Sequence, residues 1–565
     1  MAEPGGGWSY TPYSDLAEEV RHFAATLRAT DAAPGAVVTL LATEVKSFVV
    51  AFMGTLAAGL TPSPVAPPRS YRTTERYRAH LARIIEAARP AIVVTQEDTH
   101  AAAETVCQET GAKAVLVPAP TADAPQRLTE PGPAPVERAA EDLALLQFTS
   151  GSSGNPKGVR VSWGALTANV SAIRTWLRMV PDDIFASWLP LFHDMGLVGA
   201  MIMPVTSGVD LWLMTPEQFI RSPERWLECF GRHGATVTTA PSFGYSYCAR
   251  RVKPAQLEGT DFSAWRVAIL GAERIDPQGV ADFTTLVAPH GFDDRALMGA
   301  YGLAESTLAV TGVRPGEGSP LLRIANAASE FGTPVEAAEH GALGRDRVAA
   351  NWLVGCGRPV GDLRVEIVDD DGNPLPEGHF GQISVSGSSL ADGYLLSDGQ
   401  LTTFDPAGLH TGDGGFLWDG QLYVIGRVAD SLKVRGAALF AEDLEAELAR
   451  LDGLDGGRLV TLLGSVDGTD HAVLLVEASA ADGWLEPAVN TLRAATGPEI
   501  SLTVLLGRRG AIERTSSGKP RRRVLWQRLL RGDATGWTPV HGTPPSTSTA
   551  DAPHADAGTG KGDAA

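Results

Sequence analysis

Short apolar runs alternate with stretches of helical period over the first part of the chain. Val37–Leu41, Ala91–Val94 and Ala114–Val117 are continuous apolar runs typical of buried strands, and helical patterns separate them. The same alternation continues through residues 143–310. Strands that alternate with helices predict α/β units built on mostly parallel sheets.

The pattern changes near Leu363, where apolar and polar residues begin to alternate around turn signals. One predicted hairpin turns at Asp371-Gly372-Asn373, and a second spans Phe416–Ile425 with its turn at Asp419-Gly420. A helical stretch, Glu442–Leu451, and a further mixed α and β pattern lead to about residue 532. We therefore expect a β-rich subdomain followed by a smaller α+β unit.

The last residues of the chain have a different composition. Residues 538–565 consist mostly of Thr, Pro, Ser, Ala, Asp and Gly, and Val540 is their only large apolar residue. Such a segment buries too little surface to offset its ordering entropy. We predict that residues 536–565 form a disordered tail.

Composition excludes several classes of protein. The 565 residues are 44% hydrophobic and carry a formal net charge of −19, which disfavours nucleic-acid binding. None of the four cysteines forms a Cys-x-x-Cys pair, so we expect reduced thiols in a cytoplasmic protein. No targeting segment is visible. The apolar run Phe48–Leu60 is too short to span a membrane and predicts a buried helix.

A loop of small residues carries the strongest chemical signal. The predicted strand Leu143–Phe148 runs into Thr149-Ser150-Gly151-Ser152-Ser153-Gly154, and Pro156-Lys157-Gly158 follows. Glycine and hydroxyl residues turn backbone N–H groups and side-chain donors toward a phosphate, and the lysine adds a positive charge. The spacing differs from that of a Walker A loop. A flexible loop without function is the alternative, but the preceding strand and the lysine favour phosphate binding.

This loop resembles the phosphate loop of the adenylate-forming superfamily, which includes acyl-CoA synthetases, peptide-synthetase adenylation domains and luciferases. The resemblance extends from about residue 10 to residue 530. Five further motifs follow in the order of the superfamily: Gly271-Ala272-Glu273, Tyr301-Gly302-Leu303-Ala304-Glu305-Ser306, Thr411-Gly412-Asp413, Gly426-Arg427 and Thr515-Ser516-Ser517-Gly518-Lys519.

The resemblance implies ATP-dependent activation of a carboxylic acid as acyl-AMP. It implies that Lys519 acts on the α-phosphate and the carboxylate, and that Glu305, helped by Thr149, binds Mg²⁺. It also implies that Asp413 and Arg427 bind the ribose. The remaining implied ATP-binding residues are the loop Thr149–Gly154, Lys157, Gly271, Ala272, Glu273, Tyr301 (which would stack on adenine), Gly302 and Ser306.

Lys519 also stands in a locally basic segment. Residues 508–531 carry nine basic side chains and one acid, Glu513, in a chain of net negative charge. A solvated helix face explains Arg528 and Arg531, whereas near Lys519 we expect contact with phosphate or an acidic partner. Pro520 follows the lysine where the superfamily usually has an aliphatic residue, and we expect the role of Lys519 to survive this difference.

Two motifs resemble the fatty acyl-AMP ligase branch of the superfamily. They are Ser187-Trp188-Leu189-Pro190-Leu191-Phe192-His193-Asp194-Met195-Gly196-Leu197 and Ala240-Pro241-Ser242-Phe243-Gly244-Tyr245-Ser246-Tyr247-Cys248. Cys356 comes 45 positions after Thr311, an interval that is longer than in most acyl-CoA synthetases and resembles the insertion of this branch. Such an insertion packs on the N-terminal domain and hinders the use of free coenzyme A, so the acyl group passes to a separate acyl carrier protein.

The branch suggests roles for the residues of these two motifs. Candidate residues of an acyl pocket are Trp188, Phe192, Met195, Phe243 and Tyr245. His193 either lines the acyl entrance or is a structural histidine, and we favour a lining or gating role. The acyl chain itself stays open: a medium or long fatty acid is the default, and a short, branched or aromatic acid is an alternative.

The resemblance also implies a domain organisation. Residues 1–429 would form a large α/β domain with its β-rich subdomain at about 360–427, and residues 430–535 a small mobile α+β domain that pivots at Asp430. Two other functions stay open: an acyl- or aryl-CoA ligase that uses free coenzyme A, and a catalytically reduced scaffold that binds acyl-adenylate. Segment Val434–Ala438 departs from the branch and bears on carrier docking more than on adenylation.

Overall fold

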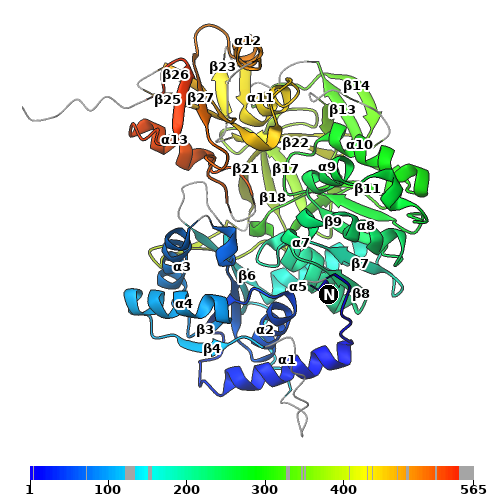
Figure 1. Cartoon of the computed structure of the whole chain (residues 1–565), viewed down its shortest axis with the longest axis vertical. Helices are drawn as coiled ribbons and strands as arrows, with labels where there is room; N and C mark the ends of the chain where they lie inside the picture. Colours follow the sequence, from blue (N-terminus) through cyan, green and yellow to red (C-terminus); the bar gives the residue numbers. More distant parts are fainter. Residues whose placement is uncertain are drawn as a thin grey trace, which may run out of the picture.

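The computed structural model describes most of the chain. The described residues are 1–3, 6–71, 73–120, 134–149, 156–325, 331–344, 348, 352–405, 407–428, 431–434, 437–466, 469–478, 483–515 and 518–545. Figure 1 shows three groups of elements: the N-terminal sheet with α1–α4, the larger body around β7–β11, and the C-terminal elements β23–α13 above them.

The first sheet is fully parallel, in the order β2-β1-β3-β4. Strands β1, β2 and β3 are buried on both faces, which explains the continuous apolar runs of β1 and β3, whereas the edge strand β4 is partly exposed. Val38 and Leu40 face the core shared with α1 and α2, whereas Leu41 and Val93 face α3 and α4. The elements are α1 (Tyr13–Arg28), β1 (Val37–Leu41), α2 (Val45–Ala57), β2 (Thr61–Pro64), α3 (Thr74–Ala88), β3 (Ile92–Thr95), α4 (Glu97–Thr110) and β4 (Val115–Pro118).

The second sheet has seven strands in the order β16-β12-β11-β10-β9-β7-β8, and its five strands from β11 to β8 are parallel. The predicted α/β class is confirmed. The strands are β7 (Ile184–Ser187), β8 (Asp210–Leu213), β9 (Val237–Ala240), β10 (Val267–Leu270), β11 (Leu297–Gly302), β12 (Ala309–Gly312) and β16 (Arg358–Pro359).

Helices cover this second sheet. The helices α7 and α8 are separate, because Pro223 lacks an N–H and restricts Ser222 to a non-helical conformation. Met195–Ile202 is a π-helix. The α-helices are α5 (Trp163–Trp176), α6 (Met203–Ser207), α7 (Pro216–Arg221), α8 (Glu224–Gly231), α9 (Ser242–Arg251) and α10 (Pro277–Val287).

Both predicted hairpins lie in a four-stranded antiparallel sheet, β17-β18-β21-β22. Asp419 and Gly420 have positive φ, as a tight hairpin turn requires. The β19-β20 hairpin leaves this sheet and pairs with β6 of the β5-β6 hairpin. The strands are β5 (Leu143–Thr149), β6 (Lys157–Ser162), β17 (Arg364–Val368), β18 (Gly381–Ser386), β19 (Gly393–Leu395), β20 (Leu401–Thr403), β21 (Leu409–Trp418) and β22 (Gln421–Arg427).

The expected insertion contains a three-stranded antiparallel sheet of β13 (Pro320–Ile324), β14 (Ala337–Ala342) and β15 (Trp352–Val354). Leu321 and Leu322 point to opposite faces of β13, and both are fully buried. Leu321 joins the core of the seven-stranded sheet, and Leu322 joins the core of β17–β22. The insertion is thus wedged between two parts of the N-terminal region.

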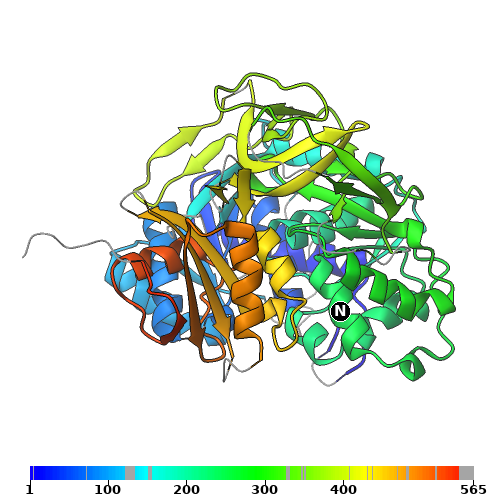
Figure 2. The same ribbon diagram turned by 90° about the horizontal axis from the view of Figure 1, so that it is seen from above.

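The C-terminal lobe, which we define as residues 431–545, has its own core. Hydrophobic clusters lie on both faces of its sheet β25-β26-β27-β28. In Figure 2, which is seen from above, the helices and strands of this lobe lie in front of the N-terminal elements. Its elements are β23 (Ser431–Val434), β24 (Ala437–Phe440), α11 (Ala441–Leu448), β25 (Leu459–Val466), β26 (Thr469–Glu477), α12 (Leu485–Thr496), β27 (Ser501–Gly507), α13 (Arg522–Leu530) and β28 (Trp537–His541).

The beginning of the expected disordered tail is ordered, so that prediction is wrong for residues 537–541. They form β28, which pairs antiparallel with β27. The Trp537 side chain is buried and packs over Gly507, where any side chain would clash with it. Residues 546–565 lie outside the described part of the chain. Among the described residues, no helix is both long and apolar enough to cross a membrane.

Candidate active site

One large cavity, of about 2610 Å³, lies between the C-terminal lobe and the N-terminal sheets. The carboxyl ends of the parallel strands β7, β9, β10 and β11 open into it, the usual position of a ligand site in such a sheet. Most of the expected site residues line it: Thr149, Lys157, Trp188, Phe192, His193, Met195, Phe243, Gly271, Ala272, Glu273, Tyr301, Gly302, Glu305, Asp413, Arg427 and Lys519.

Asp413 is the centre of one polar cluster in the cavity. Its carboxylate accepts a hydrogen bond of 2.6 Å from the Tyr301 hydroxyl and forms an ion pair of 2.8 Å with Arg427 Nε. Strands β21 and β22 place Asp413 and Arg427 directly opposite each other. Burial, followed by the nearby Asp413 carboxylate, raises the pKa of Tyr301 well above its ordinary value, so the phenol stays a hydrogen-bond donor.

Glu305 is the centre of a second cluster. The Tyr394 hydroxyl donates to Glu305 Oε1 at 2.6 Å, and Lys157 Nζ lies 4.9 Å from the centre of the Tyr394 ring. Glu305 stands in a short 3₁₀ turn, Ala304–Ser306, directly after β11. Thr307 follows with φ of 65°, a conformation that is strained for a β-branched residue and is typical of functional sites.

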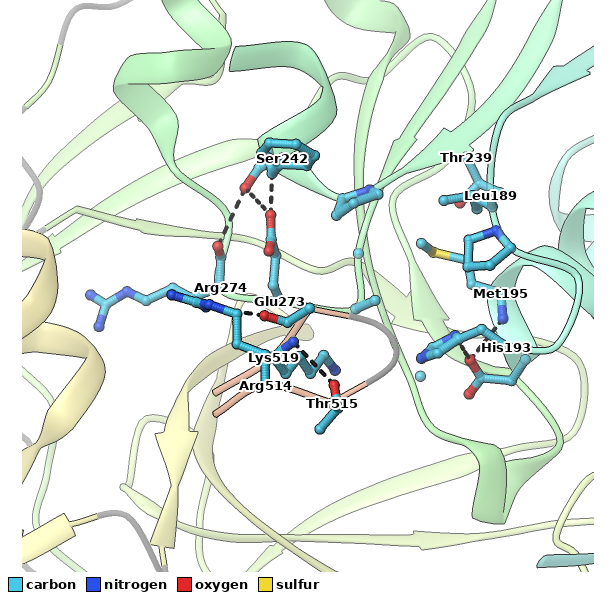
Figure 3. A pocket seen from close by; sticks show the side chains of 18 of the residues that line it. Leu189, His193, Met195, Thr239, Ser242, Glu273, Arg274, Arg514, Thr515 and Lys519 are labelled. Atoms are coloured by element: carbon cyan, nitrogen blue, oxygen red, sulfur yellow. Dashed lines mark hydrogen bonds and ion pairs between the residues drawn. The ribbon is translucent and has the colours of Figure 1, made fainter. Parts of the chain in front are cut away.

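Glu273 follows the end of β10 by three residues and lines the cavity next to the start of α9. Its Oε1 accepts hydrogen bonds of 2.8 Å from the Ser242 hydroxyl and from the Phe243 N–H. Ala272, before it, has a φ of 66°. Figure 3 shows Ser242 directly above Glu273, with Arg274 to the left and Lys519 below. The glutamate therefore fixes the first turn of α9, which carries Phe243 into the cavity.

The cavity carboxylate of Glu273 predicts a pH-dependent stability. Loss of hydration inside the cavity raises its pKa above the ordinary 4.5, although Phe243, Ser242 and the charge of Lys519 act in the opposite direction. An acid with a raised folded-state pKa holds its proton more tightly when folded, so the free energy of unfolding falls as pH rises above 4.5.

Glu273→Gln is expected to remove this loss of stability. The glutamine keeps an acceptor for Ser242 but has no proton to release, so the variant should gain stability relative to wild type as the pH is raised from 4 to 8, across the unfolded-state value of 4.5. Urea unfolding at both pH values measures it. A difference in the free energy of unfolding between the two proteins that is the same at both pH values would contradict the expectation.

The loop that carries Lys519 is closed by its own hydrogen bonds. The Thr515 N–H donates to the Lys519 carbonyl at 2.7 Å, and the Lys519 N–H donates to the Thr515 hydroxyl at 3.1 Å. Pro520 forms an antiparallel bridge with Arg514, so proline is compatible with the extended backbone here. The Lys519 side chain lines the cavity. Its positive charge acts to lower the pKa of both the Glu273 and the Asp194 carboxyl groups.

His193 faces Lys519 across the cavity and pairs with its neighbour Asp194 at 2.5 Å (Figure 3). Asp194 also accepts a hydrogen bond from the Met195 N–H. Burial opposes ionisation of Asp194, but His193, Met195 and Lys519 together hold its pKa below the ordinary value. The imidazole of His193 and the ammonium of Lys519 thus lie on opposite sides of the cavity. The region between them suits the carboxylate of a substrate.

Two ion pairs join the C-terminal lobe to the N-terminal body. Arg274, next to Glu273, pairs with Asp443 of α11, and Arg76 of α3 pairs with Glu513 at 3.6 Å. Phe440, at the start of α11, packs edge-on against Phe380 of the β-rich region. These contacts hold the lobe in the orientation that puts Lys519 inside the cavity.

The aromatic residues of the expected acyl pocket behave in two ways. Trp188 stacks on Phe219 with ring centres 4.1 Å apart and meets Phe243, which is 40% exposed, at the cavity wall. The placement of Tyr245 in the pocket is wrong. It faces the opposite side of α9, is fully buried, and its hydroxyl donates to the Ile269 carbonyl.

The structure also differs from the expectation at Ser306, which is fully buried beneath the Glu305 turn and does not line the cavity. Ser150, Gly151, Ser152, Ser153, Gly154 and the expected hinge Asp430 lie outside the described residues. The motifs did not single out Tyr394, Ser242 or Arg274 as site residues. Arg274 directly follows the motif Gly271–Glu273, so its position in the sequence could have identified it. Tyr394 reaches the site only because its strand, β19, pairs with β6.

Comparisons with known proteins agree with this geometry. Residues 4–395 match the family model described as AMP-binding enzyme. The chain is 34% identical over 530 residues to a protein of Caulobacter vibrioides (strain NA1000 / CB15N) named "Putative acyl-CoA synthetase", a match that covers 90% of this chain and 88% of that protein.

One further relative and one solved structure carry names that refer to ligases of fatty acids. The chain is 30% identical to the medium-chain-fatty-acid–[acyl-carrier-protein] ligase JamA of Moorena producens (strain JHB), over 93% of this chain and 90% of that enzyme. A solved structure from a study of fatty acyl-adenylate ligases of E. coli and L. pneumophila is 27% identical, covers 94% of both chains and has a TM-score of 0.81. The chain therefore belongs to the AMP-binding enzyme family, within the adenylate-forming superfamily that its motifs resemble.

Proposed function

We propose that the protein is a fatty acyl-AMP ligase, which activates a fatty acid with ATP and passes the acyl group to an acyl carrier protein. The observation that carries this proposal is the position of Lys519. It enters from the C-terminal lobe into the same cavity as Glu305, Asp413 and His193. A lysine brought to two carboxylates and a histidine from a separate lobe suits a reaction between anionic substrates.

ATP would bind along the carboxyl ends of the parallel strands. Asp413 would accept hydrogen bonds from both ribose hydroxyls, with Arg427 opposite it on the paired strand. Tyr301, Gly271 and Ala272 would line the adenine, and Thr149 and Lys157 would face the phosphates. The described ends of the phosphate loop, Thr149 and Lys157, are paired across β5 and β6, so both face the cavity from one position.

The reaction is a displacement at phosphorus. An oxygen of the substrate carboxylate forms a bond to the α-phosphorus of ATP while the bond to the pyrophosphate leaving group breaks. Lys519 would neutralise the charge that the carboxylate and α-phosphate share, and His193, held by Asp194, would line the opposite side. The products are acyl-AMP and pyrophosphate.

Mg²⁺ fits the residues around Glu305. The Glu305 carboxylate and the Thr149 hydroxyl, which line the same cavity, would supply hard oxygen ligands to a Mg²⁺ that takes its remaining ligands from phosphates and water. Among the described residues, no group of three or more acidic, histidine or cysteine side chains forms a dedicated metal cage, which agrees with a metal shared with the substrate. Bound there, Mg²⁺ would neutralise phosphate charge.

The wedged insertion supports transfer to a carrier protein rather than to free coenzyme A. Its buried leucines tie β13 to two cores of the N-terminal body, so the insertion stays in place when the C-terminal lobe moves. The lobe would pivot near Asp430 between adenylation and thioester formation. JamA, by its name, acts on an acyl-carrier-protein substrate, which supports the same assignment. The reaction would take place in the cytoplasm.

The Arg274–Asp443 pair is expected to stabilise the adenylation orientation of the lobe. Arg274→Ala or Asp443→Ala should slow pyrophosphate release by about threefold to tenfold, as expected for a partly exposed ion pair. The double exchange Arg274→Asp with Asp443→Arg should recover part of the rate. Arg295→Ala, which breaks the surface pair with Asp293 outside the cavity, is the control and should have no effect.

A screen of acids tests the proposal. Purified enzyme with ATP and Mg²⁺ is offered medium and long fatty acids and aromatic acids, pyrophosphate release is measured, and mass spectrometry identifies AMP esters. Fatty acids should give acyl-AMP. Rapid formation of acyl-CoA from added coenzyme A would favour the second candidate, an acyl-CoA ligase, which the name of the Caulobacter relative supports. Absence of any acyl-AMP would favour a catalytically reduced scaffold.

A further inference from the structure

Tyr394 connects two charged groups of the site that the sequence motifs treat separately. Its hydroxyl donates to Glu305, and its ring face lies under the Lys157 ammonium. The phenol therefore stands between a carboxylate and an ammonium of opposite charge. Both charges are needed for ligands, Glu305 for a cation and Lys157 for phosphate.

The position of Tyr394 depends on the hairpin that leaves the β-rich sheet. Strand β19 pairs antiparallel with β6, so that Tyr394 lies opposite Val159 and Leu395 lies opposite Gly158. This register brings Tyr394 next to the described end of the phosphate loop. The Phe404 ring meets the Tyr394 ring edge-on at 4.8 Å and fixes its plane.

The segment that leads into this hairpin is also attached to the turn that carries Glu305. The Ala391 N–H donates to the Glu305 carbonyl at 2.9 Å, and the Thr307 hydroxyl donates to the Ser389 carbonyl at 2.8 Å. These bonds hold the strained Thr307 in place. Tyr394 is thus positioned from both sides before any ligand binds.

We propose that Tyr394 is a positioning residue that keeps Glu305 and Lys157 apart and aimed at their separate ligands. Its hydroxyl occupies one carboxylate oxygen of Glu305 and leaves the other for Mg²⁺, and its ring holds Lys157 through a cation–π contact. Without the phenol, the carboxylate and the ammonium are free to pair with each other. This inference rests on the proposed function, because it assumes ATP and Mg²⁺ as ligands.

Calorimetric titration of ATP tests the role without turnover. The parent protein is the Lys519→Ala variant, and each titration is done with Mg²⁺ and with chelator. In this parent, Tyr394→Phe should weaken ATP binding about tenfold with Mg²⁺ and less than twofold without it, since a hydrogen bond to a charged group is lost while the ring remains. Tyr394→Leu should weaken ATP binding in both conditions, because Lys157 then also loses its ring contact.

Two controls separate positioning from structure. Tyr13→Phe removes a phenol hydrogen bond to the Val209 carbonyl, far from the cavity, and should leave both titrations unchanged. In a background that also carries Glu305→Gln, Tyr394→Phe should add no further loss, because the two residues act on the same metal ligand. Additive losses would overturn the proposal.

Failure of the proposed role of Tyr394 can be distinguished from failure of the proposed function. If wild-type enzyme releases no pyrophosphate with any fatty acid, the proposed function fails. If wild type is active with a fatty acid and Tyr394→Phe binds ATP with Mg²⁺ as tightly as its parent does, the function stands and the role of Tyr394 is overturned. Thermal unfolding of each variant identifies any that do not fold. If Tyr394→Phe does not fold, Tyr394→Trp replaces it as the variant that lacks the hydroxyl.

Discussion

Replacing Lys519 with alanine is expected to lower fatty-acid-dependent pyrophosphate release by about 10²- to 10⁴-fold. The lysine carries a positive charge into the cavity from the C-terminal lobe, toward the place where the carboxylate and the α-phosphate meet. Because its own loop is closed by backbone and Thr515 hydrogen bonds, truncating the side chain should leave the fold intact. A coupled assay of pyrophosphate measures the rate.

The control for this variant comes from the same basic segment. Arg531 lies after α13, is exposed and does not line the cavity, so Arg531→Ala should release pyrophosphate at the wild-type rate. Calorimetry should show ATP binding to Lys519→Ala largely unchanged, because Asp413, Tyr301 and Glu305 remain. Normal acid-dependent pyrophosphate release by Lys519→Ala would contradict the assignment of this residue.

Replacing Asp413 with alanine is expected to raise the KM for ATP about a hundredfold or more, since two hydrogen bonds to a charged group are lost. The carboxylate is buried and already aligned by Tyr301 and Arg427, so no other group in the cluster replaces it as an acceptor for the ribose hydroxyls. Steady-state kinetics with varied ATP measures this change, and the KM for the fatty acid should change far less.

Glu366→Ala is the matched control for Asp413→Ala. Glu366 is an exposed acid on β17 of the same four-stranded sheet, but it lies outside the cavity. Its replacement removes the same charge from the chain and should leave both KM values unchanged. An Asp413→Ala enzyme with wild-type affinity for ATP would place the nucleotide elsewhere in the cavity.

Local patterns predicted most of the fold. The apolar runs of β1, β3 and β4 are strands, and the two hairpins turn at Asp371–Asn373 and at Asp419-Gly420 as expected. Gly271–Glu273 follows β10, and Tyr301-Gly302 ends the neighbouring parallel strand β11, so both motifs meet at one cavity. Because the carboxyl ends of parallel strands share one edge of a sheet, motif order was enough to place these residues together.

Features that depend on long-range pairing were not predictable from the sequence. Nothing local indicates that β19 leaves its own sheet to pair with β6, so the contact of Tyr394 with Glu305 was missed. Tyr245 was misplaced because its neighbours line the cavity, whereas helical rotation turns its own side chain into the core. Trp537 and its strand were assigned to the tail because the sequence around them is polar. Local composition does not show that an edge of β27 is open for strand pairing.

A competition between two acyl acceptors tests the proposed function most directly. Enzyme, ATP, Mg²⁺ and a fatty acid are incubated with equal concentrations of free coenzyme A and a carrier protein that bears phosphopantetheine, and all thioesters are identified by mass spectrometry. The proposed function predicts acyl-AMP and acylated carrier, with little or no acyl-CoA. Acyl-CoA as the main product, with the carrier left unloaded, would contradict it.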